Sequence, residues 1–565
     1  MSDLEAAIGA RLEAFTADRV AERLWAKDGT LWAASGNAPE EVAAWLGWLD
    51  LPDAMSARVA ELEHLARGVR EDGYRRAAVL GMGGSSLAPE LFSRVFGWAG
   101  GPGGNGAASA DGLELRILDS THPAVVRGFR SWAGEQRTLF CVSSKSGTTT
   151  EPNAYQAAMS EIAPALDFVA ITDPDTALGE LARAQEFRGI IEAPPDVGGR
   201  YSALTVFGLV PAALNGVDVG ALLDRARAMA ERCRADDATQ NPGLYLGAVM
   251  GEAALAGRDK LTILTSPRLA AFGDWAEQLV AESTGKAGAG IVPIVGEPVG
   301  EPEAYGDDRF FVFLTLAGER DELGLLAGRL MELGHAGRHI ELADPLEVGA
   351  EFVRWEVATA AAGIVLGIDP FDQPNVQESK DATKDLLEAF RARGALPQPA
   401  PLVAEPGLAV TADPAALGDA PVTVDGAVQH LLTLLRAGRD YFAILAYLPP
   451  DPEVAKALQR IRQRVRDTTG VATTLGFGPR FLHSTGQLHK GGPDSGVFLQ
   501  VTADPAKDLP IPGWEETFGT LIAAQALGDL ASLQRGGRRA LRLHLDDLEA
   551  GLSRLERMVD AAVSV

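Results

Sequence analysis

Short, unbroken runs of apolar residues alternate with segments of helical periodicity along much of this chain. The run at 77–80, for example, ends in glycines and is followed by a helical pattern over 87–96. Strands without polar alternation are buried on both faces, which is typical of a parallel sheet covered by helices. The alternation starts a second time near residue 244, so the sequence predicts two α/β units in tandem.

The 565 residues divide into five predicted segments. They are a helical N-terminal arm (1–70), a first α/β unit (71–215), a second α/β unit (216–391), a linker or surface insertion rich in proline and alanine (392–428), and a C-terminal region that packs on the two units (429–565). The predicted strands of the two units are 77–80, 113–118, 138–142, 167–171, 260–265, 310–315 and 339–342. In the C-terminal region, strands are predicted at 441–448 and 497–501.

Acidic residues outnumber basic ones by 77 to 51, which gives a net charge of −26. A surface of this sign repels nucleic acid and anionic membranes, but a local positive pocket still binds a small anion. The first residues lack the features of a signal peptide, and the most apolar helical stretch, 358–368, is too short to span a bilayer. Two cysteines cannot build a multi-cysteine zinc site. We therefore expect a cytoplasmic protein without membrane, nucleic-acid or metal partners.

Two polar loops follow predicted strands of the first unit, where ligands bind in open parallel sheets. Gly81–Ser86 is glycine-rich but lacks the lysine of a Walker loop and the third glycine of a dinucleotide fingerprint. Ser143–Thr150 places serine and threonine hydroxyls around Lys145 at a helix start, which favours a phosphate cradle. The alternatives are a plain strand–helix turn for the first loop and a capped helix for the second.

Three later motifs carry groups suited to acid–base chemistry. Arg200 follows two glycines, and an arginine held in this way is able to stabilise an oxyanion. Gln278 and Glu282 are four residues apart, so a helix places an amide beside a carboxylate that is able to abstract a proton. Lys380 follows a rigid turn at 372–374. The alternative for Gln278 and Glu282 is a pair of ordinary solvated polar residues.

Histidines form two further candidate groups. His483 and His489 lie in a glycine-containing loop that holds two of the eight histidines. His335 and His339 have the i,i+4 spacing of metal ligands, but nearby glycines weaken that helix and no third ligand is evident. We interpret the second pair as ordinary surface histidines.

In type, spacing and order, these motifs resemble those of the glucose-6-phosphate isomerase family. The resemblance covers roughly residues 75–390 and 471–495. It implies an α/β fold with two tandem sugar-isomerase (SIS) domains of doubly wound parallel sheet, a helical N-terminal arm and a C-terminal extension. It further implies interconversion of glucose 6-phosphate and fructose 6-phosphate by ring opening and proton transfer through a cis-enediol, without a cofactor. A homodimer with active sites near the subunit interface is also implied.

The resemblance also implies a role for each motif. Glu282 is expected to move the proton between C2 and C1, and Arg200 to stabilise the enediolate. Lys380 and His483 are expected to open the sugar ring. The residues expected to bind the substrate are Gly84, Ser85, Ser144, Lys145, Ser146, Thr149, Gln278 and Gln373.

The histidine motif stands in an unusual place. In common bacterial members, a Leu-His-Ser-x-Gly-Gln string lies between the glutamate motif and the lysine motif, but residues 295–309 of this chain contain no such string. A matching string, Leu482–Gln487, comes after Lys380, as in the isomerase half of transaldolase–isomerase fusion proteins. The chain is too short to hold a transaldolase barrel of roughly 250 residues as well, so we expect isomerase activity alone.

Two alternative functions fit the same motifs. The first is an isomerase that acts on mannose 6-phosphate or on an amino sugar phosphate, because the shape of the pocket decides that preference. The second is a non-catalytic SIS module that binds sugar phosphates. Such a module needs only the phosphate loop, so the joint presence of Glu282, Lys380 and His483 favours an enzyme.

Overall fold

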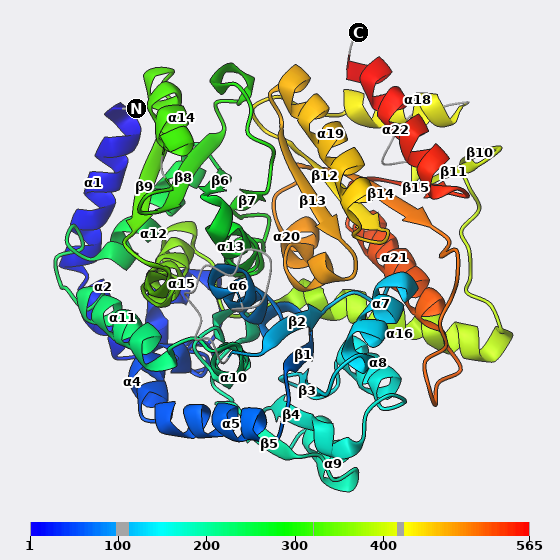
Figure 1. Ribbon diagram of the computed structural model, residues 1–565. Coiled ribbons are helices and arrows are strands. Elements are labelled where there is room, and N and C mark those ends of the chain that lie inside the picture. The colour runs from blue at the N-terminus through cyan, green and yellow to red at the C-terminus, as the bar shows by residue number, and fades with distance from the viewer. Residues whose placement is uncertain (1, 98–111, 320, 415–422, 564–565) are drawn as a thin grey trace.

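Three β-sheets form the core of the protein (Figure 1). The computed structural model describes residues 2–97, 112–319, 321–414 and 423–563. In Figure 1 the first sheet lies at the bottom, the second at the upper left and the third at the upper right.

The first sheet is parallel throughout, with the strand order β2-β1-β3-β4-β5. Its central strands β1 and β3 are buried along their whole length, as expected for apolar strands with helices on both faces. The strands are β1 (Arg76–Gly81), β2 (Glu114–Leu118), β3 (Thr138–Ser143), β4 (Phe168–Thr172) and β5 (Gly189–Glu192), and the helices are α6 (Leu87–Phe96), α7 (Pro123–Gly134), α8 (Thr150–Met159), α9 (Ala177–Ala184) and α10 (Val206–Asn215).

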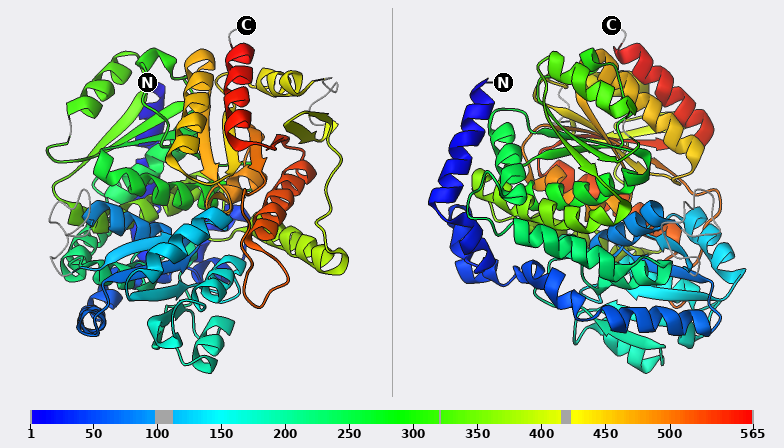
Figure 2. Two further views of the ribbon diagram at one scale, coloured as in Figure 1. Left: turned by 45° about the vertical axis from the view of Figure 1, so that its right-hand side comes forward. Right: turned by 60° about the vertical axis from the view of Figure 1, so that its left-hand side comes forward.

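The second sheet is also parallel, with the order β7-β6-β8-β9. Its strands are β6 (Lys260–Thr265), β7 (Val292–Val295), β8 (Arg309–Leu316) and β9 (Ala336–Leu342). Its helices are α11 (Val219–Arg232), α12 (Pro242–Leu255), α13 (Ala270–Thr284), α14 (Asp321–Glu332) and α15 (Val348–Leu366). The long helix α16 (Pro374–Arg393) then leads toward the third sheet, where it lies beside α21 (Figure 2).

The third sheet has the order β10-β11-β15-β14-β12-β13. Four of its strands are parallel, and β10 and β11 form an antiparallel edge. The strands are β10 (Val403–Glu405), β11 (Leu408–Ala412), β12 (Tyr441–Tyr447), β13 (Ala472–Phe477), β14 (Gly496–Ala503) and β15 (Arg539–Leu545). The helices are α18 (Val424–Thr433), α19 (Pro452–Thr469), α20 (Gly486–Gly491), α21 (Phe518–Arg535) and α22 (Leu548–Val563).

The segment 392–428, predicted as a linker or surface insertion, contains a hairpin at residues 403–412 that is formed by β10 and β11. Pro406, one of the prolines on which that prediction rested, belongs with Gly407 to the hairpin turn, and Gly407 has a φ of +88°. Leu408 and Val410 are buried against the third sheet. Residues 415–422 of the predicted linker lie outside the described residues, and the division of the chain into domains remains a prediction.

The N-terminal helices run along one side of the molecule (Figure 2, right). They are α1 (Ser2–Ala17), α2 (Val20–Trp25), α3 (Pro39–Ala43), α4 (Leu51–Ser56) and α5 (Val59–Glu71). The Nε of Arg11 lies 2.6 Å from Glu252 on α12, and the indole of Trp32 donates to the Ala360 carbonyl on α15 at 2.9 Å. The N-terminal arm is therefore fastened to the second unit.

The α/β class with parallel sheets is confirmed, and the strand at 260–265 and the helix at 348–366 have the predicted bounds. The short strands β5 and β7 were not predicted, because each has four residues. The sheet that unites the C-terminal strands was not predicted either. Among the described residues, no helix combines the length and apolar character that crossing a membrane requires.

Helices α12 and α15 pack closely because a row of glycines lies on α12. A Cβ atom added at Gly247 would lie 2.5 Å from the Ala358 carbonyl oxygen, and one added at Gly243 would lie 2.4 Å from Val357 Cγ1. Both distances are far below van der Waals contact. The small residues therefore set the distance between the two helices.

We expect Gly247→Ala to destabilise the protein by about 1–3 kcal/mol, because overpacking forces these helices apart. Gly128→Ala on α7 is the matched control, since a Cβ atom there meets nothing within 4 Å. That substitution should stabilise the helix by up to about 1 kcal/mol. Thermal unfolding midpoints of the two variants should shift in opposite directions, and equal shifts would contradict the packing argument.

Candidate active site

The two polar loops of the first unit are neighbours because β1 pairs with β3, with Gly81 opposite Ser143. After β3, the Ser144 hydroxyl donates to Thr149 Oγ1 at 3.1 Å. Lys145 forms an ion pair with Asp173 and donates to the Pro195 carbonyl at 3.0 Å. The positive charge of this lysine is therefore partly neutralised inside the protein, which the sequence alone did not indicate.

Close backbone contacts explain the glycines of the first loop. A Cβ atom at Gly84 would lie 1.9 Å from the carbonyl oxygen of Gly199. Gly83 has a φ of +54°, and its Cβ would lie 2.9 Å from the side-chain nitrogen of Gln278. The short helix η3 (Gly83–Ser85) thus touches both η5 (Gly199–Tyr201) and α13.

Arg200 is buried and its guanidinium is held from several sides. It donates to Ser283 Oγ at 2.8 Å, to Gln373 Oε1 at 2.7 Å, and to two backbone carbonyls of the turn before α16, those of Pro370 at 2.7 Å and Asp372 at 2.9 Å. Its Nη1 also lies 3.4 Å from a carboxylate oxygen of Glu282. The fold thus places a rigid positive charge directly beside a carboxylate.

Gln278 and Glu282 share one face of α13, as their spacing predicts. The amide nitrogen of Gln278 donates to Glu282 Oε2 at 3.0 Å. The amide oxygen of Gln278 is buried and has no hydrogen-bond partner among the described residues. Gln278 and Arg200 therefore orient the carboxylate. The amide oxygen of Gln278, which lies beside it, remains able to accept a hydrogen bond.

The turn that carries Gln373 is held by Lys286. The ammonium of Lys286 lies 2.6 Å from the carboxylate of Asp372. Burial is the main cause that lowers the pKa of Lys286 to about 8, and the positive charge of Arg200 adds to the effect. Lys286 therefore links the end of α13 to the turn that precedes α16.

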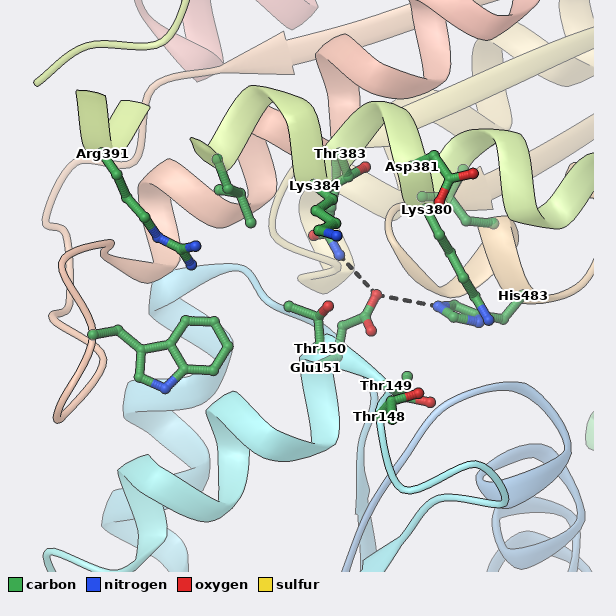
Figure 3. A pocket seen from close by; sticks show the side chains of 14 residues that line it. Thr148, Thr149, Thr150, Glu151, Lys380, Asp381, Thr383, Lys384, Arg391 and His483 are labelled. Atoms are coloured by element: carbon green, nitrogen blue, oxygen red, sulfur yellow. Dashed lines mark hydrogen bonds and ion pairs between the residues drawn. The ribbon is translucent and has the colours of Figure 1, made fainter. Parts of the chain in front are cut away.

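His483 reaches this region from the third sheet, on the short helix η9 (Arg480–His483) that follows β13. Figure 3 shows His483 and Lys380 converging, Lys380 from α16. The Nε2 atom of His483 lies 3.1 Å from Glu151 Oε1, and the same oxygen accepts a hydrogen bond from Gln525 at 2.7 Å. Burial raises the pKa of Glu151, but the charge of His483 and its hydrogen bond outweigh this, so the pKa lies below its usual value.

Sequence analysis missed Glu151 and Gln525. Glu151 follows the hydroxyl-rich loop directly, and that position was the only signal for it in the sequence. An acidic residue in the first turn of a helix is common for electrostatic reasons alone, so the signal was weak. Nothing near Gln525 in the sequence points to this site.

These side chains surround one cavity of about 300 Å³. A wider cavity of about 490 Å³ adjoins it between α8 and α16, and both are lined by Thr149, Lys380 and His483 (Figure 3). Arg200 is not among the residues that line either cavity, but its neighbour Gly199 lines the smaller one. The other predicted site residues all line the smaller cavity: Gly84, Ser85, Ser144, Lys145, Ser146, Thr149, Gln278, Glu282, Gln373, Lys380 and His483.

The remaining histidines lie elsewhere. His489 is buried among aromatic rings, with its own ring centroid 5.1 Å from that of Phe498, and burial holds its pKa well below the usual value. The interpretation of His335 as a surface histidine is wrong, because its side chain is buried and packs on Phe311. Among the described residues, no group of three or more His, Cys, Asp or Glu side chains is arranged to hold a metal ion.

Curated relatives decide the family. The chain is 30% identical over 404 residues to the glucose-6-phosphate isomerase of Carboxydothermus hydrogenoformans, which covers 60% of this chain and 85% of that protein. It is also 30% identical over 386 residues to the glucose-6-phosphate isomerase of Rubrobacter xylanophilus, covering 60% of this chain and 88% of that protein. The chain belongs to the glucose-6-phosphate isomerase family. No family model matches it.

Solved structures agree with this family in fold. A glucose-6-phosphate isomerase from Chlamydia trachomatis superposes with a TM-score of 0.53 and 19% identity, covering 69% of this chain and 87% of that chain. A hypothetical protein from Thermus thermophilus gives a TM-score of 0.53 and 23% identity, covering 66% of this chain and 96% of that chain. At these identities the likeness establishes the fold alone.

The buried position of Lys286 has a pH-dependent consequence. Its pKa of about 8 in the folded protein lies below the ordinary value of 10.5. Between these values the unfolded chain binds more protons than the folded protein, so this group adds stability as the pH rises. We expect the loss in thermal unfolding midpoint of Lys286→Met to be larger at about pH 9.5 than at about pH 7.5.

Lys456→Met provides the matched control, since Lys456 is an exposed lysine that pairs with Glu453 on α19. Its effect on the unfolding midpoint should be small at both pH values. A constant deficit for Lys286→Met across this range would contradict the assignment.

Proposed function

We propose that this protein interconverts glucose 6-phosphate and fructose 6-phosphate. The observation that carries the proposal is the carboxylate of Glu282, which lies 3.4 Å from the buried guanidinium of Arg200 at the wall of a cavity whose other side is a hydroxyl-rich loop. A base and a fixed positive charge on the same side of a substrate are what proton transfer between adjacent carbons needs.

The phosphate of the substrate binds at the hydroxyl-rich loop. Ser85, Ser144, Ser146 and Thr149 line the cavity and offer hydroxyl groups there. The positive end of the helix dipole of α8 faces the same loop. Lys145 contributes less charge than an unpaired lysine would, because Asp173 neutralises it.

The proton transfer is assigned to Glu282. Its carboxylate takes the proton from C2 of the open-chain aldose, and the electron pair forms the C1–C2 double bond of the enediolate. Arg200 stabilises the negative charge on the enediolate oxygens while the hydroxyl proton passes from O2 to O1. Return of the carbon proton from Glu282 to C1 then forms the C2 carbonyl and gives the ketose. Gln278 orients the carboxylate through its 3.0 Å hydrogen bond.

Ring opening is assigned to Lys380 and His483. The hydrogen bond between Nε2 of His483 and Glu151 orients the imidazole and leaves Nδ1 to exchange a proton with the sugar. Gln525 supports Glu151 at 2.7 Å and in turn accepts a hydrogen bond from the Thr121 hydroxyl at 2.7 Å. Glu151, Gln525 and Thr121 position the histidine without touching the substrate.

The direct test is formation of fructose 6-phosphate from glucose 6-phosphate, with mannose 6-phosphate assayed beside it. Conversion of glucose 6-phosphate supports the proposal. A marked preference for mannose 6-phosphate would reassign the substrate, and binding without any conversion would reduce the protein to a sugar-phosphate-binding module.

Glu282→Gln should lower turnover by on the order of 10²–10⁴, because the amide keeps the shape of the side chain but is not a base. The affinity for glucose 6-phosphate should stay close to that of the wild type. Steady-state kinetics and direct binding measure the two effects separately. Near-normal turnover would remove Glu282 from the role of base.

His483→Ala should slow the isomerisation of cyclic glucose 6-phosphate far more than a reaction that needs no ring opening. The comparison reaction is exchange of the C1 proton of 5-deoxyfructose 6-phosphate with solvent, because this ketose lacks the hydroxyl that closes the ring. His64→Ala, an exposed histidine on α5, is the control and should leave both rates unchanged. Equal losses on both substrates would assign ring opening to another group.

The homodimer implied by the resemblance remains a proposal. With active sites near the subunit interface, we expect the specific activity to fall when the protein is diluted below the concentration at which the dimer dissociates. Sedimentation velocity and activity measured over the same concentration range test this expectation. A fully active monomer at assay concentration would contradict the homodimer.

A further inference from the structure

A separate cavity of about 340 Å³ lies on the second unit, between α12, β9 and α15. Its lining includes three arginines, Arg232 at the end of α11, Arg338 on β9 and Arg354 on α15. We call it the arginine pocket. None of its described lining residues lines the cavity of the proposed active site.

The charge of the arginine pocket is opposite to that of the whole chain. The protein has a net charge of −26, yet the described lining of this cavity contains three arginines and no carboxylate. Like charges brought together in this way repel one another unless a negative group lies between them. The arrangement is therefore suited to an anion.

The arginines keep donors that their protein partners do not use. Arg338 pairs with Glu5 at 3.0 Å and Arg354 with Glu351 at 3.3 Å, each through Nη2, and Nη1 of Arg338 donates to the Gly337 carbonyl at 2.9 Å. The Nε atoms of Arg338 and Arg354 are buried and have no hydrogen-bond partner among the described residues. A guanidinium has five N–H donors, so both side chains retain the capacity to bind an anion.

The rest of the lining suits a molecule larger than a simple ion. Tyr245, Leu246 and Ile340 supply aromatic and apolar surface. The N-terminal end of α12, a helix of 14 residues, adds the positive end of its dipole. A cavity of this size falls at the lower end of the range for small-molecule sites.

We propose that the arginine pocket is a second binding site, which takes the phosphate group of a small phosphorylated metabolite. A phosphate dianion matches three guanidinium groups better than a single carboxylate does, because arginine binds phosphate oxygens in bidentate fashion. The apolar side of the pocket holds the remainder of the molecule. The proposal does not depend on which reaction the active site performs.

The test is isothermal titration calorimetry of the full chain with pyrophosphate as the probe. Because pyrophosphate is also expected at the hydroxyl-rich loop, all measurements use a background with Ser144→Ala and Thr149→Ala. Binding should persist in that background. Adding Arg232→Ala and Arg354→Ala should weaken it at least tenfold, while adding Arg329→Ala, an exposed arginine on α14 that pairs with Glu301, should leave it unchanged.

A second variant protects the test against misfolding. Arg232→Lys with Arg354→Lys keeps the charges but removes the bidentate geometry, so its affinity should fall between those of the background and the alanine variant. Unfolding midpoints confirm that each variant is folded. Unchanged pyrophosphate binding in the alanine variant, or an equal loss with Arg329→Ala, would overturn the proposal.

Discussion

The buried guanidinium of Arg200 is the interaction on which the arrangement of the site depends. A buried charge is costly unless every donor is satisfied, and here Ser283, Gln373 and the backbone carbonyls before α16 provide the acceptors. These partners come from α13 and from the turn after α15, whereas Arg200 belongs to the first unit. One side chain therefore fixes the first unit against the second and places a positive charge beside Glu282.

A second set of arginines attaches the third sheet to the other two. Arg462 on α19 donates to the carbonyls of Val295 at 2.7 Å and Gly296 at 2.8 Å, directly after β7. Arg480 on η9 pairs with Glu90 on α6 and lies 3.0 Å from Asp119, which follows β2. Because such buried ion pairs leave uncompensated charges when separated, the third sheet is held in one orientation.

The sequence predicted the parts of the protein whose signals are local. β1 and β3 contain unbroken apolar runs, and the hydroxyl-rich loop and the Gln278–Glu282 pair lie within single motifs. Elements whose identity depends on distant partners were missed. β11 is a strand because it pairs with β15, more than a hundred residues later, and the prolines around it pointed elsewhere. Gln525 reaches Glu151 across 374 positions, a distance over which no local pattern carries information.

His483 is brought to the candidate active site by the third sheet of the same chain. Its motif stands after Lys380 in the sequence, yet η9 follows β13 and lies against both units, because Arg480 contacts Asp119 and Asp274. Arg480, three residues before the histidine, is anchored on the first unit, and Glu151 and Gln525 meet its imidazole from α8 and α21. The proposed role of this imidazole in ring opening requires it to be held within about 1 Å of one position. Gln525 lies on α21, in the same C-terminal region as His483, and it supports the histidine through Glu151. The displaced motif and the residue that supports it therefore come from the same part of the chain.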